Sequence, residues 1–371
     1  MCTHPTLIRD KNNPYVNGCS NYLAVPCGKC IECRLEYTNT FAIRMMHESL
    51  SHSKNCFLTL TYNDEGMQKS QDEYNKFIDE SIDKLLKSCP NLSREQIEIL
   101  HFTKADRNIK SLHKRDAQNF LKRLRKRYVS NCPFNPFKER DKFLEWQDKE
   151  SIRYFLCGEY GGTFGRKHFH CILFNFYPDD VYYDKLSHRH RSPTLEQIWP
   201  YGFIDIGNVT YQSARYVSSY IVKQKFGRDT VFYDVNNLSP EFVLMSQGIG
   251  RPYLRSEEHK KQLKSLGFII CNSHKSKMPR YYENKLYDEN ERKERNELKS
   301  QFLKKARETF EESLEYLDYL RDSRKCKELH GHSYSFGEWC ERKYQEKLQE
   351  REKRKQELVN RKRKEKKNEK K

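Results

Sequence analysis

The chain has 371 residues, and its 70 Lys and Arg against 52 Asp and Glu give a formal net charge of +18 at neutral pH. This cationic excess favours a polyanionic partner. The length predicts roughly two domains. No apolar run approaches the ~18 residues of a membrane span, and the first residues lack the apolar segment of a secretory signal. We therefore expect neither a membrane partner nor secretion, and we expect the 13 cysteines to be reduced thiols or metal ligands.

The first zone, residues 1–50, holds the cluster CGKCIECR, in which Cys27, Cys30 and Cys33 are separated by two-residue gaps. Thiolates at this spacing can share one tetrahedral zinc ion, with Cys2 or Cys19 as the fourth ligand. No second cysteine or histidine pair follows at an obvious spacing. Zinc binding and unliganded thiols therefore stay equal alternatives.

The second zone, residues 55–235, contains nearly all the strand patterns. These are FLTLTY at 57–62, IRYFLCGEY at 152–160 and HFHCILFNF at 168–176. The zone is the candidate folded domain. Within it, the polar and charge-rich stretch 63–110 is expected to be a surface insertion.

Residues 112–128 form a basic helical pattern in which apolar residues occupy one face. The remaining positions carry seven cations and one carboxylate, Asp116. A charged face is often only solvated, but this imbalance favours a phosphate-binding face. The predicted DNA-binding residues are Lys114, Arg115, Lys122, Arg123, Arg125, Lys126 and Arg127.

The strongest chemical pattern is His168-Phe169-His170, followed by a continuous apolar run. Because side chains alternate along a strand, both imidazoles project from one face of a buried strand. Glu159 lies a glycine-rich turn upstream and completes a plausible three-ligand site for a divalent ion. The pair His188 and His190 has no apolar strand after it, so we interpret it as a surface loop without a metal site.

A second chemical pattern is the segment 214–224, ARYVSSYIVKQ. Spacings of four and three residues place Tyr216, Tyr220 and Lys223 along one side of a helix. Tyrosines at this spacing are common by chance among 24 tyrosines, so the segment gains weight only from the other motifs beside it.

The remaining residues are predicted to be a connecting region, 236–289, and a charged helical or disordered extension, 290–371. The last 31 residues carry 15 Lys and Arg against 7 Asp and Glu, and such a composition is typical of a disordered tail.

Five ordered segments resemble the HUH endonucleases, and within them the rolling-circle replication initiators of small circular single-stranded DNA phages of the gokushovirus type among the microviruses. The resemblance covers residues 20–225. The segments are PCGKCIECR at 26–34, FLTLTYND at 57–64, DAQNFLKRLRK at 116–126, CGEYGGTFGRKHFHCILF at 157–174 and ARYVSSYIVKQ at 214–224.

The resemblance implies an α+β palm fold, with a central antiparallel sheet flanked by helices. It also implies that His168 and His170 bind metal, that Tyr216 and Tyr220 are the nucleophiles, and that Lys223 is their basic companion. The sequence departs from the family pattern in its long insertion after the first strand motif and in Lys167, which stands where the family usually has proline.

The resulting expectation is a Mg²⁺- or Mn²⁺-dependent enzyme in the cytoplasm of a bacterial host, which nicks and rejoins an origin through a 5′-phosphotyrosyl intermediate. Its partners would be the single-stranded or replicative circular DNA and the host helicase and polymerase. One alternative is a plasmid initiator or conjugative relaxase. Another, of a different class, is a non-catalytic basic protein that binds or packages nucleic acid.

Overall fold

The computed structural model describes most of the chain, and it divides into two compact units, residues 38–282 and residues 1–37 with 283–371. Each unit is considered separately below. The described residues are 2, 5–9, 15–16, 19–20, 22–28, 30–161, 165–223, 231–271, 274–311, 314–333, 335, 337–343, 345–346, 349–350 and 353. The predicted disordered tail lies almost wholly outside them.

The larger unit is built on a five-stranded antiparallel sheet in the order β10-β5-β7-β6-β11. The central strand β7 is buried along most of its length, as its apolar run predicts. The predicted α+β fold with a central antiparallel sheet is therefore confirmed. The strands are β5 (Asn55–Thr61), β6 (Arg153–Tyr160), β7 (Lys167–Phe174), β10 (Ile204–Gly207) and β11 (Phe242–Met245).

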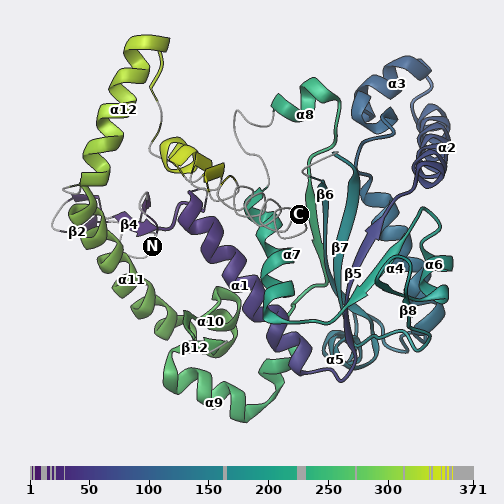
Figure 1. Ribbon diagram of the computed structural model, residues 1–371. Helices are drawn as coiled ribbons and strands as arrows, with labels where there is room; N and C mark the ends of the chain where they lie inside the picture. The colour runs from purple at the N-terminus through teal and green to yellow at the C-terminus, as the bar shows by residue number, and fades with distance from the viewer. Residues whose placement is uncertain are drawn as a thin grey trace, which may run out of the picture. The chain divides into compact units, whose positions relative to one another are not determined.

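Helices cover both faces of this sheet (Figure 1). On one face, α4 (Lys114–Tyr128) and α6 (Pro193–Ile198) pack against the side chains of Leu58, Phe169 and their neighbours. On the other face, α1 (Ile31–Leu50) and α7 (Tyr211–Lys223) form a second apolar cluster with the sheet. Successive strand residues point to opposite faces, so the two faces of β7 carry different chemistry.

The predicted insertion is helical. It comprises α2 (Asp64–Ser88), α3 (Arg94–His101) and the short 3-10 helix η1 (Lys104–Arg107). Ile78 and Ile82 of α2 pack with Ile97 of α3 in a small cluster distinct from the two sheet clusters. The remaining elements of this unit are α5 (Arg140–Glu150), β8 (Tyr182–Asp184), β9 (Arg189–Arg191), α8 (Val231–Asn236), η3 (Pro252–Arg255), α9 (Glu257–Leu266), β12 (Phe268–Cys271) and β13 (His274–Lys277), and α10 (Arg280–Leu286) crosses its boundary.

The interpretation of 236–289 as a connecting region was wrong for much of its length. Strand β11 pairs along β6, with Phe242 opposite Gly158 and Met245 opposite Phe155, and so completes the sheet. Phe242 is buried in the cluster on the α4 face. The folded domain therefore extends beyond the predicted boundary at 235, because an edge strand of only four residues gives a weak pattern in the sequence.

The smaller unit joins the two ends of the chain. Strand β1 (Thr6–Arg9) pairs with β4 (Tyr22–Val25), and β2 (Tyr15–Val16) pairs with β3 (Cys19–Ser20). The Ala24 backbone N–H donates to Ser300 Oγ at 3.0 Å, which ties β4 to α11 (Glu289–Glu311). The predicted helical character of 290–371 is seen in α11 and in α12 (Leu314–His330), but α11 packs on the N-terminal segment and is not a separate extension.

Among the helices that the structure describes, we find none with the length and apolar character that a membrane crossing requires.

Candidate active site

The predicted metal ligands lie on two neighbouring strands at the same level of the sheet. Strands β6 and β7 run antiparallel, and their register places Glu159 directly opposite His168. His170 follows two residues along β7 and therefore projects from the same face as His168. The carboxylate thus reaches the histidines through strand pairing.

The three side chains converge on one point. His168 Nε2 lies 2.6 Å and His170 Nε2 3.1 Å from the same Glu159 oxygen, Oε1. The ligand atoms of all three residues lie within 4.8 Å of one another. Two imidazole nitrogens and a carboxylate oxygen are a donor set suited to a divalent ion with open coordination positions, so the residues present fit the implied metal.

Two further contacts orient the imidazole rings. His168 Nδ1 lies 3.0 Å from the Arg166 carbonyl oxygen and donates to it, which leaves Nε2 facing Glu159. The Thr59 hydroxyl lies 3.1 Å from His170 Nδ1 and has the same effect on that ring. Such outer partners hold metal-binding histidines in one orientation.

The electrostatics keep Glu159 ionised. Its burial would raise the pKa of the carboxyl group, but hydrogen bonds from His168, His170 and Tyr220 outweigh burial and lower the pKa to about 2. A carboxylate that is charged at neutral pH can bind a cation without first losing a proton.

Helix α7 brings both predicted nucleophiles to the histidines. Ala214 and Val217 pack into the apolar cluster on this face of the sheet, and this packing directs Tyr216 and Tyr220 toward His170. The Tyr216 hydroxyl lies 3.3 Å from His170 Nε2, and the ring of Tyr220 stacks on the His170 ring at 5.4 Å. The two phenol rings are 5.1 Å apart.

The two tyrosines differ strongly in exposure. Tyr216 is 44% exposed, whereas Tyr220 is 3% exposed. Burial raises the pKa of both phenols, and for Tyr220 the hydrogen bonds to Tyr216 and Glu159 raise the pKa further. Tyr216 is therefore the phenol that a large substrate reaches first. The backbone of Lys223 closes α7, but its side chain lies outside the described residues.

The basic helix lies on the face of the sheet opposite the histidines. The α4 residues Phe120 and Leu124 pack in the cluster that contains Phe169, whereas the histidines project from the other side of β7. Some of the predicted DNA-binding cations also have structural contacts. Arg123 donates to the Ile198 carbonyl, Arg125 donates twice to the Ile152 carbonyl, and Arg115 lies 3.7 Å over the Phe77 ring.

The other four cations of α4 are exposed to solvent: Lys114, Lys122, Lys126 and Arg127. Their role in DNA binding stays a prediction. In this position they would hold DNA at a surface distant from the nucleophiles.

The predicted zinc ligands Cys27, Cys30 and Cys33 are also brought together, and Cys2 joins them. The side chain of Cys19 lies outside the described residues. The histidine pair set aside above forms part of the β8-β9 hairpin, where both rings lie near Tyr183.

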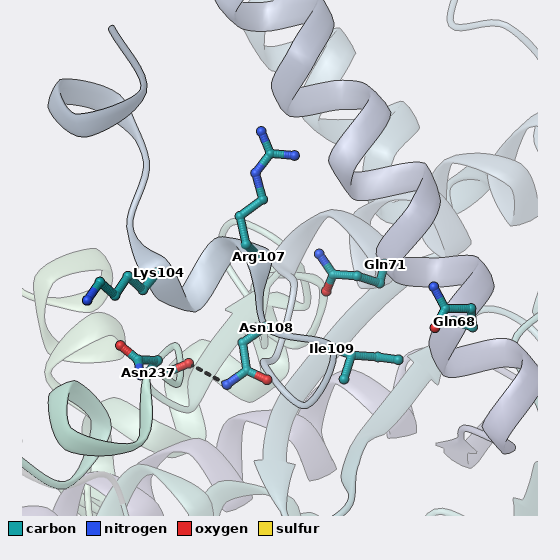
Figure 2. Close-up of a pocket in the computed structure, with 7 residues that line it drawn as sticks. All are labelled: Gln68, Gln71, Lys104, Arg107, Asn108, Ile109 and Asn237. Carbon is teal, nitrogen blue, oxygen red and sulfur yellow. Dashed lines mark hydrogen bonds between the residues drawn. The ribbon is translucent and has the colours of Figure 1, made fainter. Parts of the chain in front are cut away.

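A solvent-open pocket between α2 and the residues that follow α8 does not coincide with these groups (Figure 2). Its lining comprises Gln68, Gln71, Lys104, Arg107, Asn108, Ile109 and Asn237. None of these side chains is a thiol, imidazole, phenol or carboxylate. The pocket therefore lacks the ligands and nucleophiles that the histidine site combines.

Sequence reasoning did not single out Thr59 or Phe57, which complete the surroundings of His170. The Phe57 ring stacks on His170 at 5.7 Å, and Thr59 fixes its Nδ1. The alternation of FLTLTY places both on one face of β5, so the pattern was visible. Which face adjoins the histidines depends on the pairing of β5 with β7, which lies about 110 residues away in sequence.

Comparisons with known proteins agree with these observations. A family model for replication-associated proteins of the ORF2 type matches residues 98–225, which contain the histidines, Glu159 and both tyrosines. Replication-associated protein VP4 of Bdellovibrio phage phiMH2K is 29% identical over 268 residues, which are 70% of this chain and 66% of that protein. No solved structure matches the chain.

Two further relatives have similar descriptions. Replication-associated protein ORF2 of Spiroplasma virus 4 is 28% identical over 327 residues, 82% of this chain and 83% of that protein. Replication-associated protein ORF4 of Chlamydia phage 1 is 23% identical over 270 residues, 71% of this chain and 53% of that protein. The matched region thus spans just under two thirds of the Bdellovibrio phage protein and about half of the Chlamydia phage protein. The resemblance to phage replication initiators drawn from the sequence is confirmed.

Proposed function

From this similarity to the replication-associated proteins of small phages, we propose that the chain is a metal-dependent DNA nicking and joining enzyme that initiates rolling-circle replication of a small circular phage genome. It would act on a single-stranded or locally opened origin in the cytoplasm of the bacterial host, and it would hand the nicked DNA to the host helicase and polymerase. The observation that supports this most is the Tyr216 hydroxyl 3.3 Å from a histidine of a three-ligand cluster.

Glu159, His168 and His170 would hold the ion, either Mg²⁺ or Mn²⁺. When bound, such an ion supplies Lewis acidity that makes a phosphate more electrophilic and offsets charge on its oxygens. The imidazole nitrogens suit Mn²⁺ at least as well as Mg²⁺. The rigid β6-β7 pair keeps the three ligands in place before DNA arrives, which reduces the entropic cost of reaching the reactive geometry.

Tyr216 is the first nucleophile in this proposal. Its phenol loses a proton, its oxygen bonds to the scissile phosphorus, and the phosphorus–O3′ bond breaks. The departing 3′ oxygen takes up a proton, so one phosphodiester is exchanged for another and no nucleotide cofactor is consumed. The free 3′-OH then serves as a primer, and the 5′ end stays on the tyrosine. Lys223 follows Tyr220 by three residues and would stabilise the negative charge on phenol or leaving oxygen.

Tyr220 would act in the second half of the cycle. It packs against the same histidine as Tyr216, and its hydroxyl is hydrogen bonded to Glu159. Once Tyr216 carries the DNA end, a second phenol is needed to cleave the newly made junction without releasing the first. A plasmid initiator or relaxase would use similar chemistry, but the three relatives above are phage proteins.

The test is covalent capture of DNA. The full chain is incubated with Mn²⁺ and labelled single-stranded oligonucleotides that tile the genome encoding it, and adducts are counted on denaturing gels. We expect the wild type to form adducts on one sequence, Tyr216→Phe to lose at least about 100-fold of this first cleavage, and the double variant with Tyr220→Phe to form none. Tyr211→Phe, on the same helix but bonded to Asn39, is the matched control and should keep activity.

The metal site is tested in the same assay. His168→Ala should abolish metal-dependent nicking and leave DNA binding within a few-fold of the wild type, whereas His190→Ala in the β8-β9 hairpin should do neither. Undiminished adducts in the double tyrosine variant would refute the assignment of nucleophiles. Oligonucleotide binding without any adduct, with or without metal, would favour the non-catalytic binding protein.

A further inference from the structure

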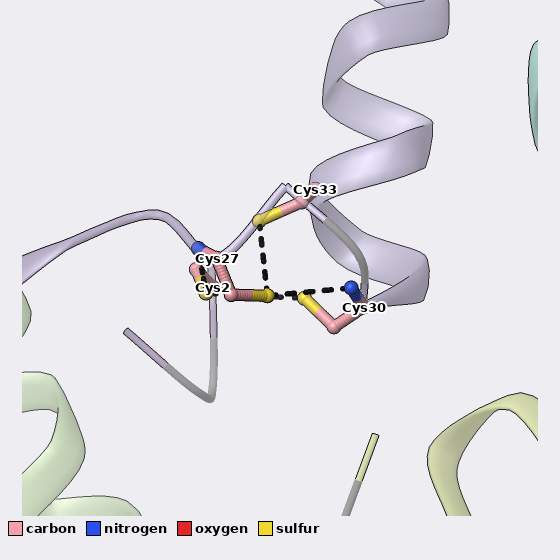
Figure 3. A group of neighbouring side chains, drawn as sticks. All are labelled: Cys2, Cys27, Cys30 and Cys33. Atoms are coloured by element: carbon pink, nitrogen blue, oxygen red, sulfur yellow. Dashed lines mark hydrogen bonds between the residues drawn. The ribbon is translucent and has the colours of Figure 1, made fainter. Parts of the chain in front are cut away.

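The smaller unit contains a cluster of four cysteines that the proposed nicking chemistry does not use. Cys2 comes from the first residues, Cys27 follows β4, and Cys30 and Cys33 lie at the beginning of α1. Their side chains point toward one another (Figure 3). The four Sγ atoms all lie within 4.8 Å of one another.

The spacing of the sulfur atoms can be compared with that required by a single ion. Zinc–sulfur bonds of about 2.3 Å in a tetrahedron separate the sulfur atoms by about 3.8 Å. Here Cys27 Sγ and Cys33 Sγ are 4.0 Å apart, and Cys30 Sγ and Cys2 Sγ are 3.9 Å apart. Both distances are nearly twice the ~2.05 Å of a disulfide bond. The space inside the cluster suits one ion and is too small for a polynuclear iron–sulfur cluster.

The surrounding backbone is arranged to stabilise thiolates. The Cys27 N–H donates to Cys2 Sγ at 3.3 Å, and the Cys30 N–H donates to Cys27 Sγ at 3.3 Å. Hydrogen bonds of this kind place partial positive charge next to sulfur and hold the ligands in position. They also fix the relative positions of three separate stretches of chain.

The cluster is shielded from water. Cys2 and Cys30 are buried, and Ala24 and Leu303 pack with them in one apolar cluster. Hydrogen bonds with the thiols of Cys2 and Cys30, together with burial, raise the pKa of the Cys33 thiol. Thiolates crowded in this way need a cation, because ionisation of several neighbouring thiols is otherwise opposed by their mutual repulsion.

We propose that Cys2, Cys27, Cys30 and Cys33 bind one structural Zn²⁺ ion. This ion fixes the N-terminal residues to the first turn of α1 and supports the packing of Leu303 of α11 against them. Tetrahedral sites of four thiolates are typical of zinc, whereas the nitrogen and oxygen ligands of the histidine site suit Mn²⁺ or Mg²⁺. The protein therefore has two metal sites of different chemistry, one structural and one catalytic.

The first measurement is the zinc content of the full chain, purified without chelators and analysed by inductively coupled plasma mass spectrometry. We expect about one zinc ion per chain in the wild type and in the double variant His168→Ala/His170→Ala, which separates this site from the histidine site. Cys30→Ser should lose at least about tenfold of the bound zinc. Cys89→Ser removes an exposed thiol after α2 and is the matched control that should keep it.

Cobalt substitution keeps the proposal testable even if Cys30→Ser does not fold. In the wild-type chain, Co²⁺ bound to thiolates in a tetrahedron gives a sulfur-to-cobalt charge-transfer band in the near ultraviolet and strong visible d–d bands. Zinc should displace cobalt and remove these bands. A wild-type chain with less than about 0.1 equivalent of zinc and no cobalt–thiolate band would overturn the proposal, as would stoichiometric iron in place of zinc. Zinc that disappears with the two histidines would also contradict it, whereas loss of nicking with zinc retained would concern only the histidine site.

Discussion

A buried polar cluster lies beneath the histidine strand, on the α4 face of the sheet. Lys167 is 1% exposed, and its ammonium donates to the Ser111 carbonyl at 3.0 Å. Asp116 accepts hydrogen bonds from Tyr62 at 2.7 Å and from Ser70 at 2.6 Å. The lysine that stands where the family usually has proline is thus a structural contact, and it points away from the metal ligands.

His113 belongs to this buried region and makes stability sensitive to acid. Burial, together with the nearby charge of Lys167, lowers the pKa of His113 to about 3, and its neutral ring lies 3.1 Å from Gln71 Oε1. The folded-state pKa lies below the unfolded value of about 6.5, so between these values the unfolded chain binds more protons. The contribution of His113 is therefore complete above pH 6.5 and is lost as pH falls toward 3.

We predict that His113→Gln flattens this dependence. Between pH 6.5 and pH 4, the free energy of unfolding of the wild type should fall more than that of the variant, by up to about 3 kcal/mol at ~1.4 kcal/mol per pH unit. Urea unfolding at several pH values measures the difference. Parallel pH profiles for the two proteins would show that His113 is protonated in the folded chain.

At the level of residues, the sequence predicts the ligands well and their surroundings poorly. The period of two along a strand was enough to place His168 and His170 on one face. Glu159 was expected through a glycine-rich turn, and its position opposite His168 follows from strand register. The roles of Thr59 and Phe57 could not be predicted, because they depend on which distant strand pairs with β7.

At the level of elements, α4 and α7 lie on opposite faces of the sheet, and this separates affinity from chemistry. The triple variant Lys122→Ala/Lys126→Ala/Arg127→Ala removes exposed cations of α4 and leaves its packing intact. We predict weaker binding of single-stranded DNA, with a salt dependence reduced by up to about two logarithmic units per tenfold change in salt. Nicking at saturating DNA should be unchanged.

The control for that prediction removes three lysines of α9 instead, Lys260, Lys261 and Lys264. Fluorescence anisotropy at several salt concentrations compares the two variants. Equal weakening in both would mean that α4 contributes only its share of net charge. Arg125→Ala is expected to behave differently from both, because it leaves the buried Ile152 carbonyl without two hydrogen bonds and should destabilise the fold by about 1–3 kcal/mol.

The sequence predicts the helices and long strands of the larger unit, because amphipathic periods and buried apolar runs are local patterns. Strand β11 was missed, since four residues carry too little periodicity to distinguish a strand from a loop. The packing of α11 on β4 was missed as well, although the Ala24 N–H donates to Ser300 across 276 positions of the chain. Contacts between residues so far apart leave no local pattern in one sequence.

At the level of the whole molecule, the net charge of +18 is spread over parts with different roles. Residues 354–371 contain ten Lys and Arg and three Glu, a net charge of +7. A chain that ends at Lys353 should bind DNA more weakly and with a smaller salt dependence, yet should cleave bound DNA at the rate of the full chain. Single-turnover nicking measured with protein in excess tests this. A large loss of the cleavage rate would assign the tail a part in the reaction.

The central claim is that a phenol of α7 becomes covalently attached to a DNA 5′ end. Trypsin cuts after Arg215 and Lys223 and releases the peptide 216–223, which contains Tyr216, Tyr220 and two serines. Tandem mass spectrometry of the adduct formed with Mn²⁺, after nuclease digestion of the DNA, locates the attached nucleotide. The account predicts the nucleotide on Tyr216 after the first cleavage and on Tyr220 in Tyr216→Phe if any adduct remains. A nucleotide on a serine or outside this peptide, or cleaved DNA with no attached peptide, would contradict it.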